Sequence, residues 1–276
     1  VASRGLGDVY KRQPINAITG HYNLWLVTLS YAIAVLASYV ALDFVGRLRA
    51  EQNNTAKLSW LAGGAFTMGY GIWSMHFIGM LAFEMPMPMS YEFTWTAASL
   101  FIAMLASALA LFILRKKEYS GKQVALGGVL IGLGIAAMHY MGMKGMEPDV
   151  IIRYRPGVFI LSIAIAIFAA EAALWLALQS NQGSAKRQLN LKIISALVMG
   201  VAICGMHYTG MAAVVFLPNA SMGEMHPKIQ PEYLAFFVAG IATLIISSAL
   251  AVSTYYKMMI NACLLYTSPS PRDATL

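Results

Sequence analysis

Apolar residues follow one another in seven long stretches, which are separated by short polar segments. The stretches cover about 24–45, 58–82, 94–114, 124–143, 158–179, 192–216 and 233–255. About 20 apolar residues in helical form cross the hydrocarbon core of a bilayer. Lipid offers no hydrogen-bond partner to a bare backbone, so each stretch is expected to be helical. The pattern therefore predicts an all-α, polytopic membrane protein with seven transmembrane helices.

The basic residues between the stretches predict how the chain is oriented. The first, third and fifth loops carry ten lysines and arginines, whereas the second, fourth and sixth carry four. Loops rich in Lys and Arg stay on the cytoplasmic side. We therefore expect the N-terminus outside and the C-terminus inside, in the bacterial cytoplasmic membrane.

Composition supports a membrane protein and excludes nucleic acid as a partner. The chain has 276 residues, of which 59% are hydrophobic and 11% charged, against about 25% charged in soluble domains. Its mean hydropathy is +0.64. The net charge of +7 comes from lysines and arginines that cluster between the apolar stretches. Such clusters are typical of the residues that set the orientation of a membrane protein. The two cysteines, Cys204 and Cys263, make neither a disulfide framework nor a zinc pattern.

Both ends of the chain look foreign to the rest. The segments "SRGLGDVYKRQ" and "CLLYTSPSPRD" resemble translated sequencing adaptors and do not continue the neighbouring helical pattern. We interpret residues 1–13 and 263–276 as artefacts and set them aside. The expected membrane domain is 14–262.

Three pairs of stretches repeat one another. The segments that begin at Leu29, Ala98 and Leu161 align, with a serine, an isoleucine and an alanine at matching positions. The repeats, at about 24–82, 94–143 and 158–216, are followed by an extra helix at 233–255. Three equivalent units can gather around a pseudo-symmetric axis, which would bring their outer ends together.

Each repeat ends in the same phrase, Met-His followed two residues later by Gly-Met. "MHFIGM" begins at Met75, "MHYMGM" at Met138 and "MHYTGM" at Met206. Within each phrase the histidine and the last methionine are four residues apart and share a helical face. Imidazole and thioether together suit copper, Cu(I) especially, or the axial positions of haem. The candidate metal ligands are Met75, His76, Met80, Met138, His139, Met143, Met206, His207 and Met211.

With these phrases the chain resembles the MHYT domain, a bacterial integral-membrane sensory module. The sequence "MHYT" itself stands at 206–209, and the resemblance covers roughly residues 20–256. It implies seven spans with outward-facing motifs, and sensing of oxygen, CO or NO through copper held by the Met and His residues. It also implies a cytoplasmic output domain for cyclic di-GMP turnover, which this sequence does not contain.

We therefore expect a sensory module that binds copper and a diatomic gas and signals to a cytoplasmic partner. The alternatives are a haem-binding membrane redox protein and a copper transporter. We do not expect an enzyme, because the sequence offers no nucleophile–base pair, phosphate loop or carboxylate dyad.

Other residues are weaker candidates. His21 is a candidate fourth imidazole, and the outer loop Met85–Met89 is a candidate entry patch for copper. Cys204 is a candidate thiolate, and Glu171 is an unexplained ionisable group within a span. A further outer loop holds His226. Asp43 is expected to pair with Arg47, four residues on.

Overall fold

Seven long helices dominate the part of the chain that the structure describes. The computed structural model describes residues 17–87, 89–115, 120–146, 150–179, 185–218 and 228–267. The helices are α1 (Leu24–Ala50), α2 (Asn54–Leu81), α3 (Phe93–Leu114), α4 (Gly121–Lys144), α5 (Pro156–Gln179), α6 (Ala185–Ala213) and α7 (Pro231–Thr267). Asn23, Asn53 and Ser120 accept backbone N–H groups as N-caps of α1, α2 and α4.

Six of these helices are long and apolar enough to cross a membrane, and together they make this a multi-pass membrane protein. The six are α1, α3, α4, α5, α6 and α7. Helix α2 falls short of the others in hydropathy, and it is also the helix with the most buried residues. A helix that is surrounded by other helices does not need an apolar surface against lipid.

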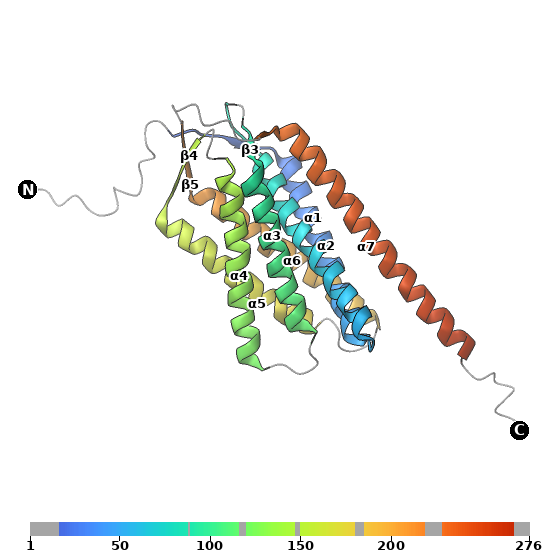
Figure 1. The fold of residues 1–276 in the computed structure, drawn as a ribbon. Helices are drawn as coiled ribbons and strands as arrows, with labels where there is room; N and C mark the ends of the chain where they lie inside the picture. Colours follow the sequence, from blue (N-terminus) through green and yellow to red (C-terminus); the bar gives the residue numbers. More distant parts are fainter. Residues whose placement is uncertain are drawn as a thin grey trace, which may run out of the picture.

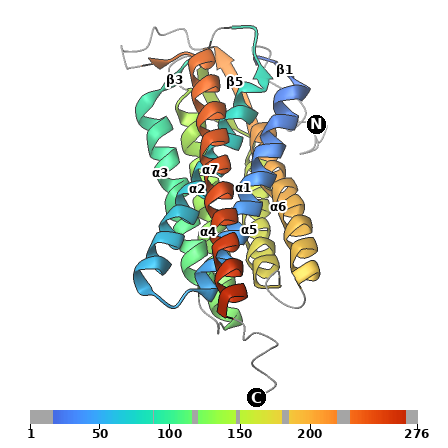
Figure 2. The same cartoon turned by 90° about the vertical axis from the view of Figure 1, so that its right-hand side faces the viewer.

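The first six helices form a closed ring (Figures 1 and 2). Each helix packs against the next one along the chain, and α6 returns to α1. Helix α7 lies outside this ring, against α2 and α1. Its contact side is a stripe of buried residues at helical spacing: Leu234, Val238, Ala242, Ile246, Ala249 and Ser253.

Glycines let the ring close at equivalent places in the three repeats. A Cβ at Gly69 would lie 2.7 Å from the Cα of Met104, and one at Gly132 would lie 2.5 Å from the Cα of Ile167. At Gly200 it would lie 2.5 Å from a methyl carbon of Val35. Each glycine of an even helix thus receives the odd helix of another repeat, as small residues do in membrane bundles.

Six short strands cover one end of the ring, which we call the strand end. They are β1 (His21–Tyr22), β2 (Phe83–Glu84), β3 (Tyr91–Glu92), β4 (Val150–Tyr154), β5 (Val214–Pro218) and β6 (Lys228–Ile229). They pair antiparallel as β1–β2, β3–β6 and β4–β5. Three equivalent backbone hydrogen bonds lie beside them: Asn23 N–H to Ala82 O, Glu92 N–H to Gly145 O and Arg155 N–H to Ala213 O. Each one ties the start of a repeat to its own end.

The structure differs from the sequence prediction at several boundaries. The sixth stretch was predicted to be helical to 216, but α6 ends at Ala213 and Val214–Pro218 pairs with β4. The extra helix was predicted over 233–255, but α7 runs to Thr267. No proline or glycine interrupts the sequence between 256 and 267, so nothing local ends this helix earlier. Residues 1–13 lie outside the described residues, and their interpretation as an artefact stays a prediction.

The first prediction concerns the glycine contacts of the ring. Gly132→Ala should lower the free energy of unfolding by about 1–3 kcal/mol, because the new methyl group would overlap the α5 backbone. Gly240→Ala is the matched control, since a Cβ at Gly240 on α7 meets nothing within 4 Å. Thermal unfolding of the detergent-solubilised variants measures both. Equal melting temperatures for the two variants would show that α4 and α5 do not pack this closely.

Candidate metal centre

The three histidines of the Met-His phrases meet on the axis of the ring. We call His76, His139 and His207 the histidine cluster. Their candidate ligand nitrogens all lie within 4.8 Å of one another. The Nδ1 atom of His76 lies 3.0 Å from Nδ1 of His139 and 3.1 Å from Nδ1 of His207. All three residues are fully buried. The convergence that the repeats suggested is therefore present.

Each histidine is seated against the glycine of another phrase. A Cβ at Gly142 would lie 2.3 Å from Nε2 of His76, and one at Gly210 would lie 2.3 Å from Nε2 of His139. A Cβ at Gly79 would lie 2.4 Å from Nε2 of His207. Only glycine leaves room for an imidazole at these three positions. The three phrases therefore interlock in a cycle. The glycine of each phrase contacts the histidine of the phrase before it around the ring.

A ring of serines braces the phrases from outside. Ser30, Ser99 and Ser162 are fully buried, and each donates its hydroxyl to the carbonyl three residues earlier. Ser30 accepts from Tyr208, and Ser162 accepts from Tyr140. The first phrase has Phe77 in place of a tyrosine, and Trp73, one turn earlier, donates Nε1–H to Ser99 at 3.0 Å instead. These bonds again join the even helix of one repeat to the odd helix of the next repeat in the ring.

The polar atoms of the histidine cluster are poorly satisfied by the protein. The Nε2 atoms of all three histidines are buried and have no hydrogen-bond partner among the described residues. The two Nδ1 contacts share one atom, that of His76. Each buried polar atom left without a partner costs about 1–3 kcal/mol, and such atoms in a native protein call for an unseen water or ion.

The spacing of the Nδ1 atoms fits a shared ion. Donors that each lie about 2.0–2.1 Å from one ion, in trigonal or tetrahedral geometry, stand about 3.3–3.6 Å apart. The observed separations of 3.0 and 3.1 Å are close to this range. Imidazole binds Cu, Zn, Fe and Ni. The donor set therefore fits a transition metal and does not fit Mg²⁺ or Ca²⁺.

The six methionines that are candidate ligands are all buried. Met80, Met143 and Met211, which we call the methionine ring, stand one helical turn from the histidines toward the strand end. They are 1%, 0% and 5% exposed, so their sulfur atoms do not face solvent. Met75 and Met138 lie in the central core, whereas Met206 packs with Ala136 and Ala166 in a separate small cluster. Their role as ligands stays a prediction.

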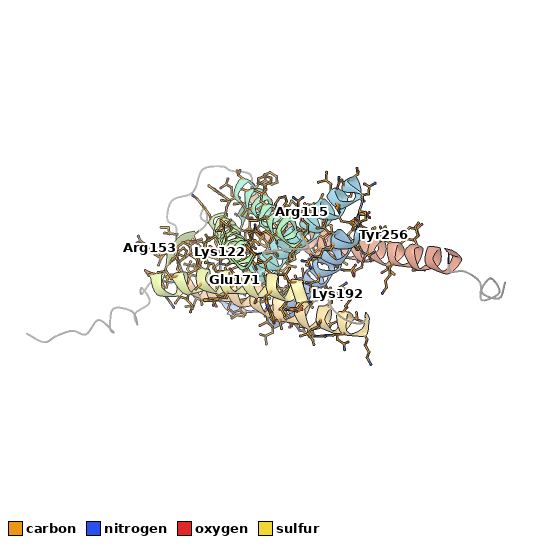
Figure 3. The ribbon with its side chains drawn as sticks, turned by 90° about the horizontal axis from the view of Figure 1, so that it is seen from below. Arg115, Lys122, Arg153, Glu171, Lys192 and Tyr256 are labelled. Atoms are coloured by element: carbon orange, nitrogen blue, oxygen red, sulfur yellow. The ribbon has the colours of Figure 1, made fainter. Side chains whose placement is uncertain are left out.

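The weaker candidates lie apart from the histidine cluster. His21 is exposed, and its Nε2 lies 2.9 Å from a carboxylate oxygen of Glu84. Cys204 is buried and free, and it is not a member of the group of metal-ligating side chains among the described residues. The carboxylate of Glu171 lies against Gly128 of α4, on the side of α5 seen in Figure 3. His226 lies outside the described residues.

The methionines of the loop between α2 and α3 lie beside the core that holds the methionine ring. Met85, Met87 and Met89 are half-buried and pack against the same apolar cluster as Met80 and Met143. The proposed copper entry patch is thus adjacent to the phrases, although its role stays a prediction.

A second polar cluster lies at the opposite end of the ring. Arg47 donates to Asp43 at 3.0 Å, as the sequence spacing predicted, and Lys192 of α6 donates to Asp43 at 2.8 Å. Ser253 of α7 also contacts both Asp43 and Arg47. These four side chains, the polar junction, hold α1, α6 and α7 together. Figure 3 shows this end and labels Lys192.

Next to the polar junction, Tyr256 ties α7 to the end of α1. Its hydroxyl donates to Glu51 Oε2 at 2.9 Å. The backbone N–H of Asn53 donates to Oε1 of the same carboxyl, and these bonds hold the pKa of Glu51 below its usual value. Glu51 is therefore a carboxylate at neutral pH, and it accepts from Tyr256.

Sequence reasoning missed the exchange between repeats. The repeats predicted that the three units gather around an axis, but not that each histidine and each serine would contact a different repeat. The repeated glycine one turn after Met75, Met138 and Met206 was the available signal, because it marks a close approach.

A ring of apolar helices around a buried histidine cluster defines a multi-pass membrane protein with three internal repeats. Comparison with known proteins then identifies it. The MHYT family, described as "Bacterial signalling protein N terminal repeat", matches at residues 15–56, 69–127 and 132–189. The chain belongs to this family, as its motifs predicted.

The curated relatives are bacterial signalling proteins. The chain is 47% identical over 234 residues to the bifunctional diguanylate cyclase/cyclic di-GMP phosphodiesterase MucR of Pseudomonas aeruginosa, covering 84% of this chain and 34% of that protein. It is 36% identical over 225 residues to the cyclic di-GMP phosphodiesterase NbdA of the same species, covering 81% and 28%. It is 35% identical over 241 residues to the signaling protein YkoW of Bacillus subtilis, covering 86% and 30%. The chain thus spans about a third of the length of these relatives. No solved structure matches it.

The second prediction concerns the serine brace. Ser162→Ala should cost about 1–3 kcal/mol of stability, because it leaves the Tyr140 hydroxyl without its partner. The double variant Ser162→Ala, Tyr140→Phe should recover most of this loss, since both polar groups are gone. Thermal unfolding in detergent provides the comparison. A double variant as unstable as the single one would mean that the hydroxyl pair is not what holds the helices.

Proposed function

We propose that this chain is a membrane sensory module whose histidine cluster binds one copper ion, Cu(I), and through it a diatomic gas: oxygen, CO or NO. The observation that carries the proposal is the convergence of three fully buried imidazoles, with Nδ1 atoms 3.0 and 3.1 Å apart. An ion shared by the three Nδ1 atoms would give each imidazole a ligand bond in place of these contacts, whereas each Nε2–H would still face the glycine of the next phrase.

The methionine ring supports copper over other metals. Three imidazoles alone also suit zinc, whereas thioether ligands favour Cu(I). Met80, Met143 and Met211 each stand four residues after a histidine of the cluster, on the same helical face, and are shielded from solvent. Burial also excludes water from the site. A Cu(I) ion with a free position would supply gas binding.

The geometry gives less support to the two alternatives. Two axial histidines on one haem iron keep their nitrogens about 4 Å apart across a macrocycle, whereas the Nδ1 atoms here are 3.0 and 3.1 Å apart with no ring between them. A copper transporter needs ligands along a whole path, but the cavity on the side away from the strands is lined mostly by Ile, Ala and Leu, with two methionines, Met68 and Met199, and no histidine.

We further propose that α2 is the seventh span. Its 28 residues extend about 42 Å as a helix, and its neighbours α1, α3 and α7 shield its polar residues from lipid. More of the described basic residues lie near the end opposite the strands than near the strand end: Arg47, Arg49, Lys57, Arg115, Lys122, Lys186, Arg187 and Lys192 against Lys144, Arg153, Arg155 and Lys228. The histidine cluster and the strand end would therefore face outward, and the C-terminus inward, in the bacterial cytoplasmic membrane.

The output of the module would act through α7. This helix has no counterpart in the repeats, and the polar junction connects its inner part to α1 and α6. The printed names of MucR and NbdA describe cyclic di-GMP synthesis or breakdown. We propose that this module regulates a cytoplasmic output of that kind and is not itself an enzyme.

The third prediction tests copper binding. Purified chain loaded under reducing conditions should hold one copper per chain, and His207→Ala should weaken binding by at least about 100-fold, because even second-sphere changes cost 10–100-fold. His21→Ala is the matched control, since its imidazole is exposed on Glu84. Elemental analysis and competition with a Cu(I) chelator measure content and affinity.

Two outcomes would contradict the proposal at different levels. Equal copper content in wild type and His207→Ala would exclude the histidine cluster as the site. Zinc that binds more tightly than Cu(I), and is lost in His207→Ala, would keep the site but make copper wrong.

The fourth prediction concerns the polar junction. Asp43→Asn should destabilise the fold by about 1–3 kcal/mol, between the values for exposed and buried pairs, because Arg47 and Lys192 lose their shared carboxylate. It should also speed proteolysis of the inner end of α7. Glu232→Gln, an exposed carboxylate on the same helix, is the control. Identical cleavage rates in the two variants would show that the junction does not hold α7.

A further inference from the structure

An apolar cavity lies on the ring axis, on the side of the histidine cluster away from the strands. Its volume is about 80 Å³, and all six helices of the ring contribute to it. Ile72, Ile135 and Ile203 line it, and each stands four residues before a histidine of the cluster. Four residues rise about 6 Å along a helix. The three isoleucines therefore separate the cavity from the three imidazoles by one helical turn.

The rest of the lining follows the threefold repeat. Met68, Ile131 and Met199 each stand eight residues before a histidine, and Ala41, Ala110 and Ala173 occupy equivalent positions on the odd helices. Ser107 is the single residue with a hydroxyl among the lining side chains. The small alanines create the space, and the repeat places it on the axis.

The size and chemistry of the cavity restrict its occupant. A buried water needs two to four polar partners, and apolar cavities of this kind stay dry and take up xenon or other apolar guests. Sites for drug-sized ligands measure about 300–1,000 Å³, so 80 Å³ is too small for a quinone or a haem. One small apolar molecule, such as a diatomic gas, fits.

We propose that this cavity is the docking site from which a diatomic gas reaches the histidine cluster. The inference rests on the proposed function, because it supplies that function's ligand from the membrane side. Diatomic gases dissolve in hydrocarbon, and the cavity lies at the depth of the apolar helices. The guest would wait beneath the isoleucines and pass between them to the imidazoles.

The test uses two neighbouring alanines on α5 that face opposite ways. Ala173 lines the cavity, whereas Ala172 is exposed on the outer face. Ala173→Leu fills the cavity with three carbon atoms, and Ala172→Leu adds the same atoms outside it. Ala110→Leu on α3, with the exposed Ala97→Leu as its control, repeats the comparison if Ala173→Leu fails to fold.

Two measurements on the full chain in detergent separate the cavity from the metal site. Xenon uptake, followed by ¹²⁹Xe NMR, needs no metal. The association rate of CO with Cu(I)-loaded protein reports on access. Wild type and Ala172→Leu should take up xenon, whereas Ala173→Leu should bind it about tenfold more weakly and associate with CO about tenfold more slowly, with unchanged copper content.

Several results would overturn the inference. One is a wild type that takes up no xenon, including the case in which a copurified acyl chain fills the cavity. Another is an Ala173→Leu variant that excludes xenon yet binds CO at the wild-type rate. Failure of the wild type to bind copper would instead contradict the proposed function, and the xenon comparison would still stand.

Discussion

The reciprocal seating of each histidine on the glycine of another phrase is the contact on which the rest of the structure depends. A Cβ at Gly79, Gly142 or Gly210 would come within 2.3–2.4 Å of an imidazole nitrogen, so each histidine occupies space that only glycine leaves free. Because the contacts run in a cycle, no one histidine can shift without moving the helix that receives it. The cycle also explains why His and Gly recur together in all three phrases, since a change in either residue disturbs a partner in another repeat.

The interlock organises successive layers along one axis. From the strand end these are the backbone ties between the start and end of each repeat, the methionine ring, the histidine cluster and the isoleucines that cover the cavity. The three imidazoles thus lie at one level of a largely apolar interior, where effective dielectric is low and unpaired nitrogens are costly. On the proposed function, an ion shared by the three Nδ1 atoms would bind all three repeats at once. Its binding energy would then act on the ring as a whole.

Periodicity in the sequence predicted the helices and the repeats well, because lipid exposure and duplication leave regular patterns. The same patterns could not predict the strand end, since two-residue strands such as His21–Tyr22 and Tyr91–Glu92 owe their pairing to tertiary proximity. They also could not predict that Ser99 would bind Trp73, because the first phrase has Phe77 where the others have tyrosine. Contacts between repeats cannot be predicted from the sequence of one helix pair considered alone. On the proposed function, the identity of the bound ion would likewise depend on sulfur positions that spacing alone does not determine.

Helix α7 breaks the threefold symmetry and, on the proposed function, would give a symmetric site a directional output. It packs on α2 and α1 and leaves α4 and α5 uncovered. The helix that carries His76 is therefore also the one that α7 rests on, along a stripe from Leu234 to Ser253. At the far end of that stripe the polar junction connects Ser253 to Asp43 of α1, which Lys192 of α6 also contacts. On the proposed function, a ligand that draws the three phrases together would move α2 and α6 relative to α1. Helix α7 contacts α1 and α2 directly and is linked to α6 through the polar junction. A signal would then be transmitted from the ring by a rigid displacement of α7.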